Sequence, residues 1–191
     1  MPPKAKITKE MILKAVLEIT REIGFDAVNA RMIAGKLNCS TRPIFTCYSN
    51  MDEMKKEFLE YAYEFYESYV SQYHEKSEIP SFLILPVSYI EFARDETNLF
   101  KLLFINDMEL KMSETKDFYS EIGNEKKAKA FAELIGAEIE DAKDIYLDFF
   151  LYSHGIAVLT ATGKILFTRK TIEKMMDNML SALIGQKKGI V

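Results

Sequence analysis

Three polar residues close together in the sequence, Thr41, Arg42 and Thr46, carry side chains suited to reading the edges of DNA bases. An arginine guanidinium can donate two hydrogen bonds to guanine, and a threonine methyl can contact the methyl of thymine. Arg42 could equally contact phosphate or stay solvated, because most hydrogen bonds between proteins and DNA go to the backbone. Either role requires a helix that presents these residues at the surface.

Residue patterns for other kinds of chemistry are missing from the sequence. It contains no G-x-G-x-x-G, no G-x-x-x-x-G-K-[ST] and no H-E-x-x-H, so we do not expect an enzyme or a cofactor. The two histidines are far apart and the two cysteines, Cys39 and Cys47, form no close pair, so no zinc site is expected. His154 follows Ser153 directly, but no third member of a catalytic triad is evident.

The net charge of the whole chain hides an uneven distribution. The 191 residues carry a formal charge of −4, which by itself argues against a nucleic-acid-binding protein. Residues 1–50, however, contain eight basic and four acidic side chains, whereas the remainder contains 17 basic and 25 acidic ones. A head of charge +4 on a body of charge −8 is expected when only the head meets phosphate.

Helical periodicity predicts the element that comes before these polar residues. An apolar stripe with the spacing i, i+3, i+4, i+7 and i+11 runs from Ile12 to Ile23. Thr8 is a suitable N-cap, and Gly24 can adopt the left-handed conformation that often ends a helix. The first helix is therefore predicted from about Thr8 to Ile23.

Two short helices should follow, separated by three residues. Asn29 is predicted to cap a helix over Ala30–Leu37, and Asn38 can adopt the left-handed conformation in the break. The next helix is predicted over Thr41–Cys47, with Ser40 as its N-cap. Because Pro43 has no N–H, the Ser40 hydroxyl should accept a hydrogen bond from the Arg42 N–H instead.

The rest of the chain also has helical periodicity, and strand alternation is nearly absent, so the predicted fold class is all-α. A long helix capped by Asn50 is predicted from Met51 to about His74. Further helices are predicted at about Ser81–Arg94, Leu99–Ile105, Thr115–Gly136, Glu138–Thr162 and Thr171–Ile184.

The three N-terminal helices fit a helix-turn-helix within a three-helix bundle, and several linked groups of residues carry a family resemblance. The groups are Ile12-Leu13-Lys14-Ala15-Val16, Glu22-Ile23-Gly24-Phe25, Ile33-Ala34, Ser40 and the segment from Ile44 to Met54. With these residues, the stretch from Ile7 to Tyr61 resembles the N-terminal domain of TetR/AcrR-family transcriptional regulators. Ser153-His154-Gly155 is also similar, more weakly, to a His-Gly signature of one subclass of their regulatory domains.

The resemblance implies a DNA-binding domain over residues 1–50 and a helical effector-binding and dimerisation domain over residues 51–191. The expected function is a ligand-responsive regulator, a repressor that a small apolar or amphipathic effector releases from a double-stranded DNA operator. The predicted DNA-binding residues are Lys6, Arg31, Ser40, Thr41, Arg42, Pro43, Phe45, Thr46, Tyr48 and Lys55.

Three positions depart from the pattern of the family. Where the family usually has tyrosine, often histidine, and lysine, this chain has Phe45, Cys47 and Met51. The usual residues tend to touch phosphate, and each lost phosphate contact should lower the salt dependence of binding by about one unit of slope. The alternative prediction is therefore a degenerate member that binds a ligand or a protein with little DNA binding.

Aromatic residues of the body are the candidates for an effector pocket. Aromatic stripes at helical spacing more often form a core, but the resemblance implies an effector held between the middle helices. A pocket of phenylalanine, tyrosine and methionine would favour an apolar or amphipathic molecule. His154 is either a satisfied core or interface histidine or an effector contact. The candidate pocket residues are Tyr61, Phe65, Tyr89, Phe92, Phe104 and His154.

The last two predicted helices carry apolar residues on more than one face, which suggests burial against a second copy of the chain. The resemblance implies a homodimer closed by a four-helix bundle of these C-terminal helices. No secretion signal is evident at the start of the sequence, and the apolar stretch from Ile145 to Phe167 is interrupted by charged residues. We therefore expect a cytoplasmic protein without a membrane anchor.

Overall fold

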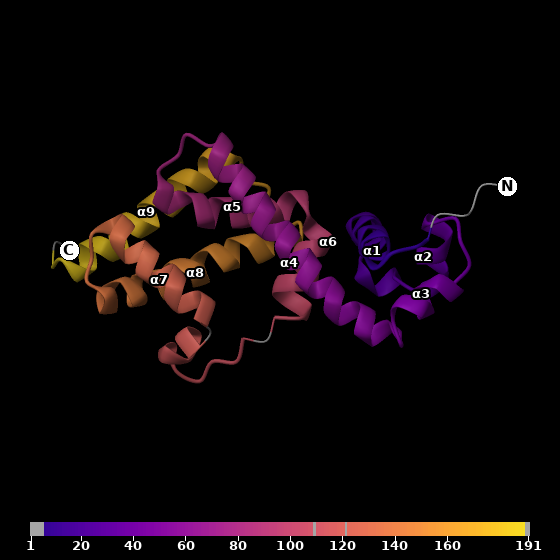
Figure 1. Ribbon diagram of the computed structural model, residues 1–191. Coiled ribbons are helices and arrows are strands. Elements are labelled where there is room, and N and C mark those ends of the chain that lie inside the picture. The colour runs from indigo at the N-terminus through magenta and orange to yellow at the C-terminus, as the bar shows by residue number, and fades with distance from the viewer. Residues whose placement is uncertain (1–5, 109, 121, 190–191) are drawn as a thin grey trace. The chain divides into compact units, whose positions relative to one another are not determined.

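The computed structural model describes residues 6–108, 110–120 and 122–189, and within these ranges regular structure is helical, without strands. The predicted all-α class is therefore confirmed (Figure 1). The α-helices are α1 (Lys9–Ile23), α2 (Ala30–Lys36), α3 (Arg42–Cys47), α4 (Met51–Lys76), α5 (Ser81–Asp95), α6 (Thr97–Lys101), α7 (Ile122–Ile135), α8 (Ile139–Ala161) and α9 (Arg169–Lys187). Shorter turns of helix are η1 (Phe25–Ala27), η2 (Leu102–Asn106) and η3 (Thr115–Ser120).

The chain forms two compact units. The first contains the described residues up to Ser68 together with Glu96–Asp107, and the second contains Tyr69–Asp95 and the described residues from Met108 onward. The boundary falls inside α4, and α6 with η2 belongs to the first unit although α5 belongs to the second. The predicted boundary lies between residues 50 and 51. The first compact unit extends beyond it, because it also includes residues 51–68 and Glu96–Asp107.

The first unit is built around one buried stripe of α1. Ile12, Val16 and Ile19 are at most 3% exposed, and α2, α3 and α6 pack against this helix. Phe58 of α4 is also fully buried and stacks on Phe25 with ring centroids 5.5 Å apart. The periodicity that predicted the first helix therefore also supplies the core of this unit.

The second unit is centred on α5 and α8. These helices pack against each other, α7 packs on α8, and α9 packs on both α5 and α8. Their facing residues are apolar, with Val87 and Ile90 of α5, Ala157 of α8 and Met176 of α9 all fully buried. Burial of these stripes is the main stabilising contribution of the unit.

Several local predictions agree with the structure because they depend on nearby residues. Thr8 accepts a hydrogen bond from the Met11 N–H at 3.2 Å, and Asn29 accepts from the N–H groups of Arg31 and Met32. Gly24 has φ +88°, and Asn38 has φ +51° in the break between α2 and α3. The side chain of Asn50 caps α4 by accepting from the Glu53 N–H at 2.8 Å.

Other predicted boundaries differ from the structure. The predicted helix Leu99–Ile105 is a short α-helix followed by a π-helical turn, and the predicted helix Thr115–Gly136 begins instead as η3. Residue 121, between η3 and α7, lies outside the described residues. Within the described ranges, no helix combines the length and apolar character that a membrane span requires.

Candidate functional site

The segment from α2 to α3 forms a compact pair of short helices on the surface of the first unit (Figure 1). Asn29 fixes the start of α2, and α2 ends where the Cys39 N–H donates to the Ala34 carbonyl at 2.9 Å. The positive φ of Asn38 then turns the chain towards α3. Ile33 and Ile44 anchor the two helices, because both side chains are fully buried.

The predicted cap of α3 is wrong. The cap position belongs to Thr41, whose backbone is already in the helical region at φ −71° and ψ −16°, and no side chain caps the helix there. The Thr41 carbonyl instead accepts from the Ile44 N–H at 3.1 Å, which forms the first turn. Ser40 lies one residue before this cap position and is exposed at the surface.

Five of the predicted DNA-binding residues border one hollow of about 650 Å³ in the first unit. Arg42 and Thr46 lie on α3, and the Thr46 hydroxyl donates to the Arg42 carbonyl at 3.0 Å. The five predicted residues that line this hollow are Lys6, Ser40, Arg42, Pro43 and Thr46. Cys47, one of the positions that depart from the family pattern, also lines the hollow. The other lining residues were not singled out for this surface, namely Ile7, Met11, Leu37, Asn38 and Cys39.

The remaining predicted DNA-binding residues differ widely in exposure. Arg31 is exposed, Thr41 is half-buried, and Phe45 is 50% exposed although its side chain is apolar. Tyr48 is only 2% exposed, so its role in this structure is packing within the first unit. Burial, followed by the nearby Glu57 carboxylate, raises the pKa of its phenol well above the ordinary value.

Two lysines of the first unit are held by partners within that unit. Lys55 donates to Asp107 at 2.8 Å, so its charge is already partly neutralised. The ammonium of Lys9 lies 4.7 Å above the ring of Tyr48 and also donates to Glu57. Both contacts join residues far apart in the sequence, and helical periodicity cannot detect such pairs.

An ion pair joins the end of α1 to α6. The Arg21 guanidinium donates to both carboxylate oxygens of Glu96, with N–O distances of 2.6 and 2.7 Å. Asn98 reinforces the contact, because its amide donates to the Arg21 carbonyl at 3.0 Å. Glu96 is 9% exposed whereas the Arg21 side chain is 46% exposed, so the carboxylate is the more desolvated partner.

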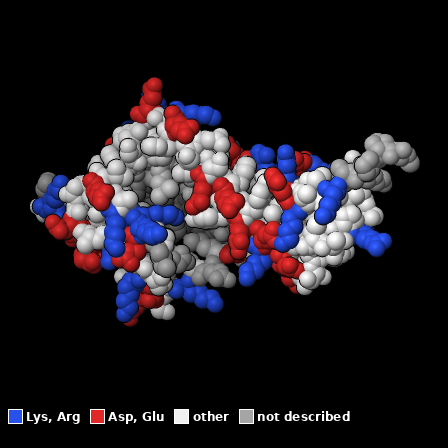
Figure 2. Space-filling view, viewed as in Figure 1, with Lys and Arg blue, Asp and Glu red and all other residues white. Residues whose placement is uncertain are grey.

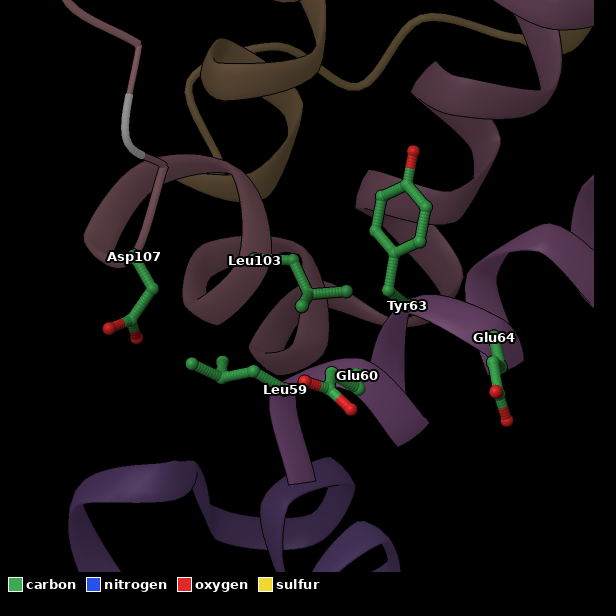
Figure 3. Close-up of a pocket in the computed structure, with 6 residues that line it drawn as sticks. All are labelled: Leu59, Glu60, Tyr63, Glu64, Leu103 and Asp107. Carbon is green, nitrogen blue, oxygen red and sulfur yellow. The ribbon is translucent and has the colours of Figure 1, made fainter. Parts of the chain in front are cut away.

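A second depression in the first unit has an acidic rim. It measures about 540 Å³ and lies between α4 and the segment around η2 (Figure 3). Leu59 and Leu103 lie at its centre, whereas Asp107 and Glu64 stand at opposite edges of the view. Asp107 is engaged by Lys55, and Glu64 points away from the two leucines, so these carboxylates do not converge on one position.

The predicted effector residues are divided between the two units. Tyr61, Phe65 and Phe104 belong to the first unit, whereas the other three residues belong to the second. Phe104 packs edge-on against Tyr66 with ring centroids 4.9 Å apart, and the Arg21 guanidinium lies 5.5 Å from the Phe65 ring.

The other three predicted residues lie in packed surroundings in the second unit. Phe92 is fully buried, and its ring centroid is 5.2 Å from that of Tyr69. The Tyr89 hydroxyl lies 2.9 Å from Nδ1 of His154, and this imidazole also stacks on Phe150 at 5.7 Å. Burial lowers the pKa of His154, which favours the neutral ring. His154 is thus half-buried and has aromatic and polar neighbours within the second unit.

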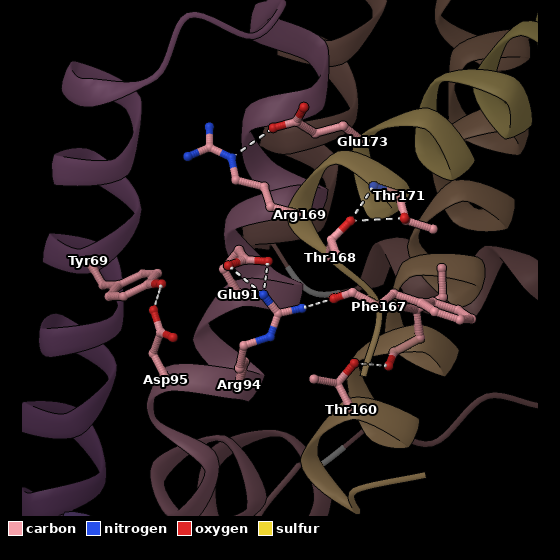
Figure 4. A network of polar contacts seen from close by, with 11 residues as sticks. Tyr69, Glu91, Arg94, Asp95, Thr160, Phe167, Thr168, Arg169, Thr171 and Glu173 are labelled. Carbon is pink, nitrogen blue, oxygen red and sulfur yellow. Dashed lines mark hydrogen bonds and ion pairs between the residues drawn. The ribbon is translucent and has the colours of Figure 1, made fainter. Parts of the chain in front are cut away.

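A polar network ties α5 to the start of α9 (Figure 4). Arg94 donates to the Glu91 carboxylate at 2.9 and 3.0 Å and to the Phe167 carbonyl at 2.6 Å. Burial raises the pKa of Glu91, because its desolvation outweighs the attraction of the Arg94 charge. Tyr69 donates to Asp95 at 2.7 Å nearby.

Comparisons with known proteins add no assignment to these observations. No family model matches the sequence, and a search among curated proteins found no match either. Within the described residues, no three His, Cys, Asp or Glu side chains gather in a way that could hold a metal ion.

Proposed function

We propose that the chain is a sequence-specific, ligand-responsive transcriptional regulator of the TetR/AcrR kind. In this proposal α2 and α3 form a helix-turn-helix, and α3 enters the major groove of a DNA operator. The observation that carries the proposal is the exposure of two polar residues of α3, Arg42 and Thr46, which lie with Ser40 and Lys6 around one hollow. Asn29, Asn38 and the buried Ile44 hold that surface in place.

The charge of this region supports contact with phosphate only locally. Basic and acidic side chains are interspersed on the face of the molecule shown in Figure 2. The excess of basic residues is confined to residues 1–50, and the remainder is acidic. An acidic remainder repels phosphate, so non-specific binding should be weak and strongly reduced by salt.

The second unit supports the proposal of a homodimer. Leu151 and Leu159 of α8 are 49% and 44% exposed, and Gly155 lies between them on the same face of the helix. An exposed apolar face with a small central residue permits close approach of the same helix from a second copy. Two DNA-binding units would then address two half-sites roughly 34–36 Å apart.

Effector binding is proposed to favour a dimer whose two DNA-binding units are wrongly spaced. The loss of operator affinity then equals the difference in effector affinity between the two states. Release of a repressor is the version that we propose for this chain.

A second candidate function is a ligand- or partner-binding protein with little affinity for DNA. Two observations favour it: Lys55 is paired with Asp107, and Tyr48 is buried. Phe45 adds an exposed apolar side chain on the face where a polar contact would be useful. This candidate predicts the same fold and dimer but no preference among DNA sequences.

A footprint on DNA separates the two candidates. The full chain is incubated with the DNA immediately upstream of its own gene and exposed to hydroxyl radicals. The proposed regulator protects two segments centred about one helical turn apart, and Arg42→Ala reduces that protection. Uniform cleavage along the fragment, without a protected segment even at the highest protein concentration, would support the second candidate instead.

A further inference from the structure

The second unit contains a small apolar cavity between α5, α7 and α8, none of whose lining residues was predicted to contact an effector. Its volume is about 140 Å³, similar to the cavity of roughly 150 Å³ that holds a benzene ring in another protein. The walls are mostly aromatic or aliphatic. The larger apolar side chains that line it are Phe82, Leu85, Phe131, Leu134, Tyr146 and Phe149.

A proline inside α5, Pro86, borders this cavity. A proline in a helix has no N–H for the carbonyl four residues earlier, here that of Phe82, and its ring pushes that carbonyl away. The cavity is therefore bordered by a stretch of α5 that cannot pack as a regular helix would.

The charge at this cavity comes from a lysine. Among the described residues that line it, Lys127 of α7 is the only charged one, and it is half-buried. The positions three and four residues away on either side hold Gly123, Asn124, Ala130 and Phe131, so α7 supplies no carboxylate at the usual spacing. The first residue of α5, Ser81, also lines the cavity and places the positive end of that helix there.

We infer that this cavity binds a small aromatic carboxylate. The ring fills the space between Phe82, Phe131 and Phe149, where offset or edge-to-face contacts with aromatic side chains are favourable. The carboxylate lies at the rim and accepts a charge-assisted hydrogen bond from Lys127. The binding site is argued from the second unit alone, and only its role as the effector site rests on the proposed function.

Calorimetric titration of the full chain tests the site without DNA. The probes are phenylacetate and two molecules of matched shape, neutral 2-phenylethanol and cationic 2-phenylethylamine. We expect phenylacetate to bind at least about tenfold more tightly than 2-phenylethanol, because only the carboxylate pairs with Lys127. Equal affinities for the three probes, or no binding of phenylacetate, would overturn the proposal.

Variants on α7 locate the interaction. Lys127→Gln should remove the advantage of phenylacetate over 2-phenylethanol, whereas Lys126→Gln, at an exposed neighbour that does not line the cavity, should keep it. Ala130→Leu should reduce the binding of phenylacetate and of 2-phenylethanol, because Ala130 lines the cavity and a larger side chain there would occupy part of its space. Circular dichroism checks that each variant is folded. Unchanged phenylacetate affinity in Lys127→Gln would contradict the assignment.

The effector role has a separate readout. Phenylacetate at a saturating concentration should weaken binding of the full chain to its upstream DNA, and Lys127→Gln should respond less. If phenylacetate binds with the expected selectivity and upstream DNA binding does not change, the site stands and its effector role is excluded. If the protein shows no sequence preference for DNA, the calorimetric result still decides the site.

Discussion

At the scale of single residues, the surroundings of each basic side chain decide which of them can meet phosphate. Lys55 is held by Asp107 at 2.8 Å, whereas Arg42 and Lys6 are exposed beside the hollow at α3. A lysine already paired with a carboxylate gains less from a new anion, because the first contact must be broken. Arg42 is therefore the residue on which the proposed DNA interface most depends.

Arg42→Ala should weaken binding to the cognate operator by about 1–3 kcal/mol and relax the preference at one base pair. The reason is the loss of a bidentate contact that only a guanidinium can supply at that position. Fluorescence anisotropy with labelled upstream DNA measures the effect, and Lys170→Ala, an exposed lysine of the second unit, is the control. Equal weakening on random DNA would instead make Arg42 a phosphate contact.

His154 should make the stability of the protein depend on pH. Burial lowers the pKa of His154 in the folded state below the usual 6.5. At a pH between the folded and unfolded pKa values, the unfolded chain therefore binds a proton that the folded chain does not. The free energy of unfolding should therefore fall as the pH drops below about 6.5, and level off below the folded pKa. Urea denaturation of the wild type and of His154→Gln, carried out at several values between about pH 5 and pH 8, measures this dependence.

A flatter pH profile in His154→Gln agrees with this account. Identical profiles for the two proteins would show that the imidazole does not carry the effect. The Tyr89 hydroxyl, which lies 2.9 Å from the ring, offers a matched variant, since Tyr89→Phe keeps the imidazole but removes that neighbour.

At the scale of elements, the predictable features are those determined within a few residues. Thr8, Asn29 and Asn50 cap helices because their side chains reach N–H groups two or three residues ahead. Ser40 has a residue type that is equally suited to capping, but the cap position of α3 is Thr41, whose backbone is helical. Residue type alone does not tell which of two adjacent polar residues precedes a short helix that is anchored by a buried residue such as Ile44.

Contacts between distant segments could not be predicted from the sequence. Arg21 and Glu96 are 75 residues apart, and nothing in the pattern of either helix marks them as partners. The six aromatic and histidine candidates for the effector pocket belong to two different units, and the sequence does not indicate this division, because spacing along a helix gives the face of a residue but not the helix that covers it. Tyr48 shows that a residue near an exposed surface can still be core.

Arg21→Ala should lower the free energy of unfolding by about 1–2 kcal/mol. It removes two hydrogen bonds to the nearly buried Glu96 carboxylate, and the exposed side of Arg21 limits the loss. Lys14→Ala, at an exposed position of the same helix, is the control. Chemical denaturation followed by far-UV circular dichroism measures both variants, and equal stability of Arg21→Ala and wild type would contradict the assignment.

At the scale of the whole molecule, the proposed homodimer is the feature that would bring two DNA-binding units, one from each copy, to one operator. Leu159→Asp should shift the protein towards a monomer, because it places a charge on the exposed apolar face of α8. Lys174→Asp, at an exposed position of α9, is the control for added negative charge. Sedimentation velocity measures the mass, and an unchanged dimer in Leu159→Asp would remove this face from the interface.

Sequence-specific binding to DNA is the central claim, and its most direct measurement compares two DNA fragments at two salt concentrations. The full chain is titrated into labelled upstream DNA and into a shuffled fragment of equal length, and the ratio of the two affinities is determined. A regulator of the proposed kind should bind the upstream fragment much more tightly, and its affinity for both fragments should fall as salt rises because phosphate contacts release counterions. Equal affinity for the two fragments at both salt concentrations would contradict it.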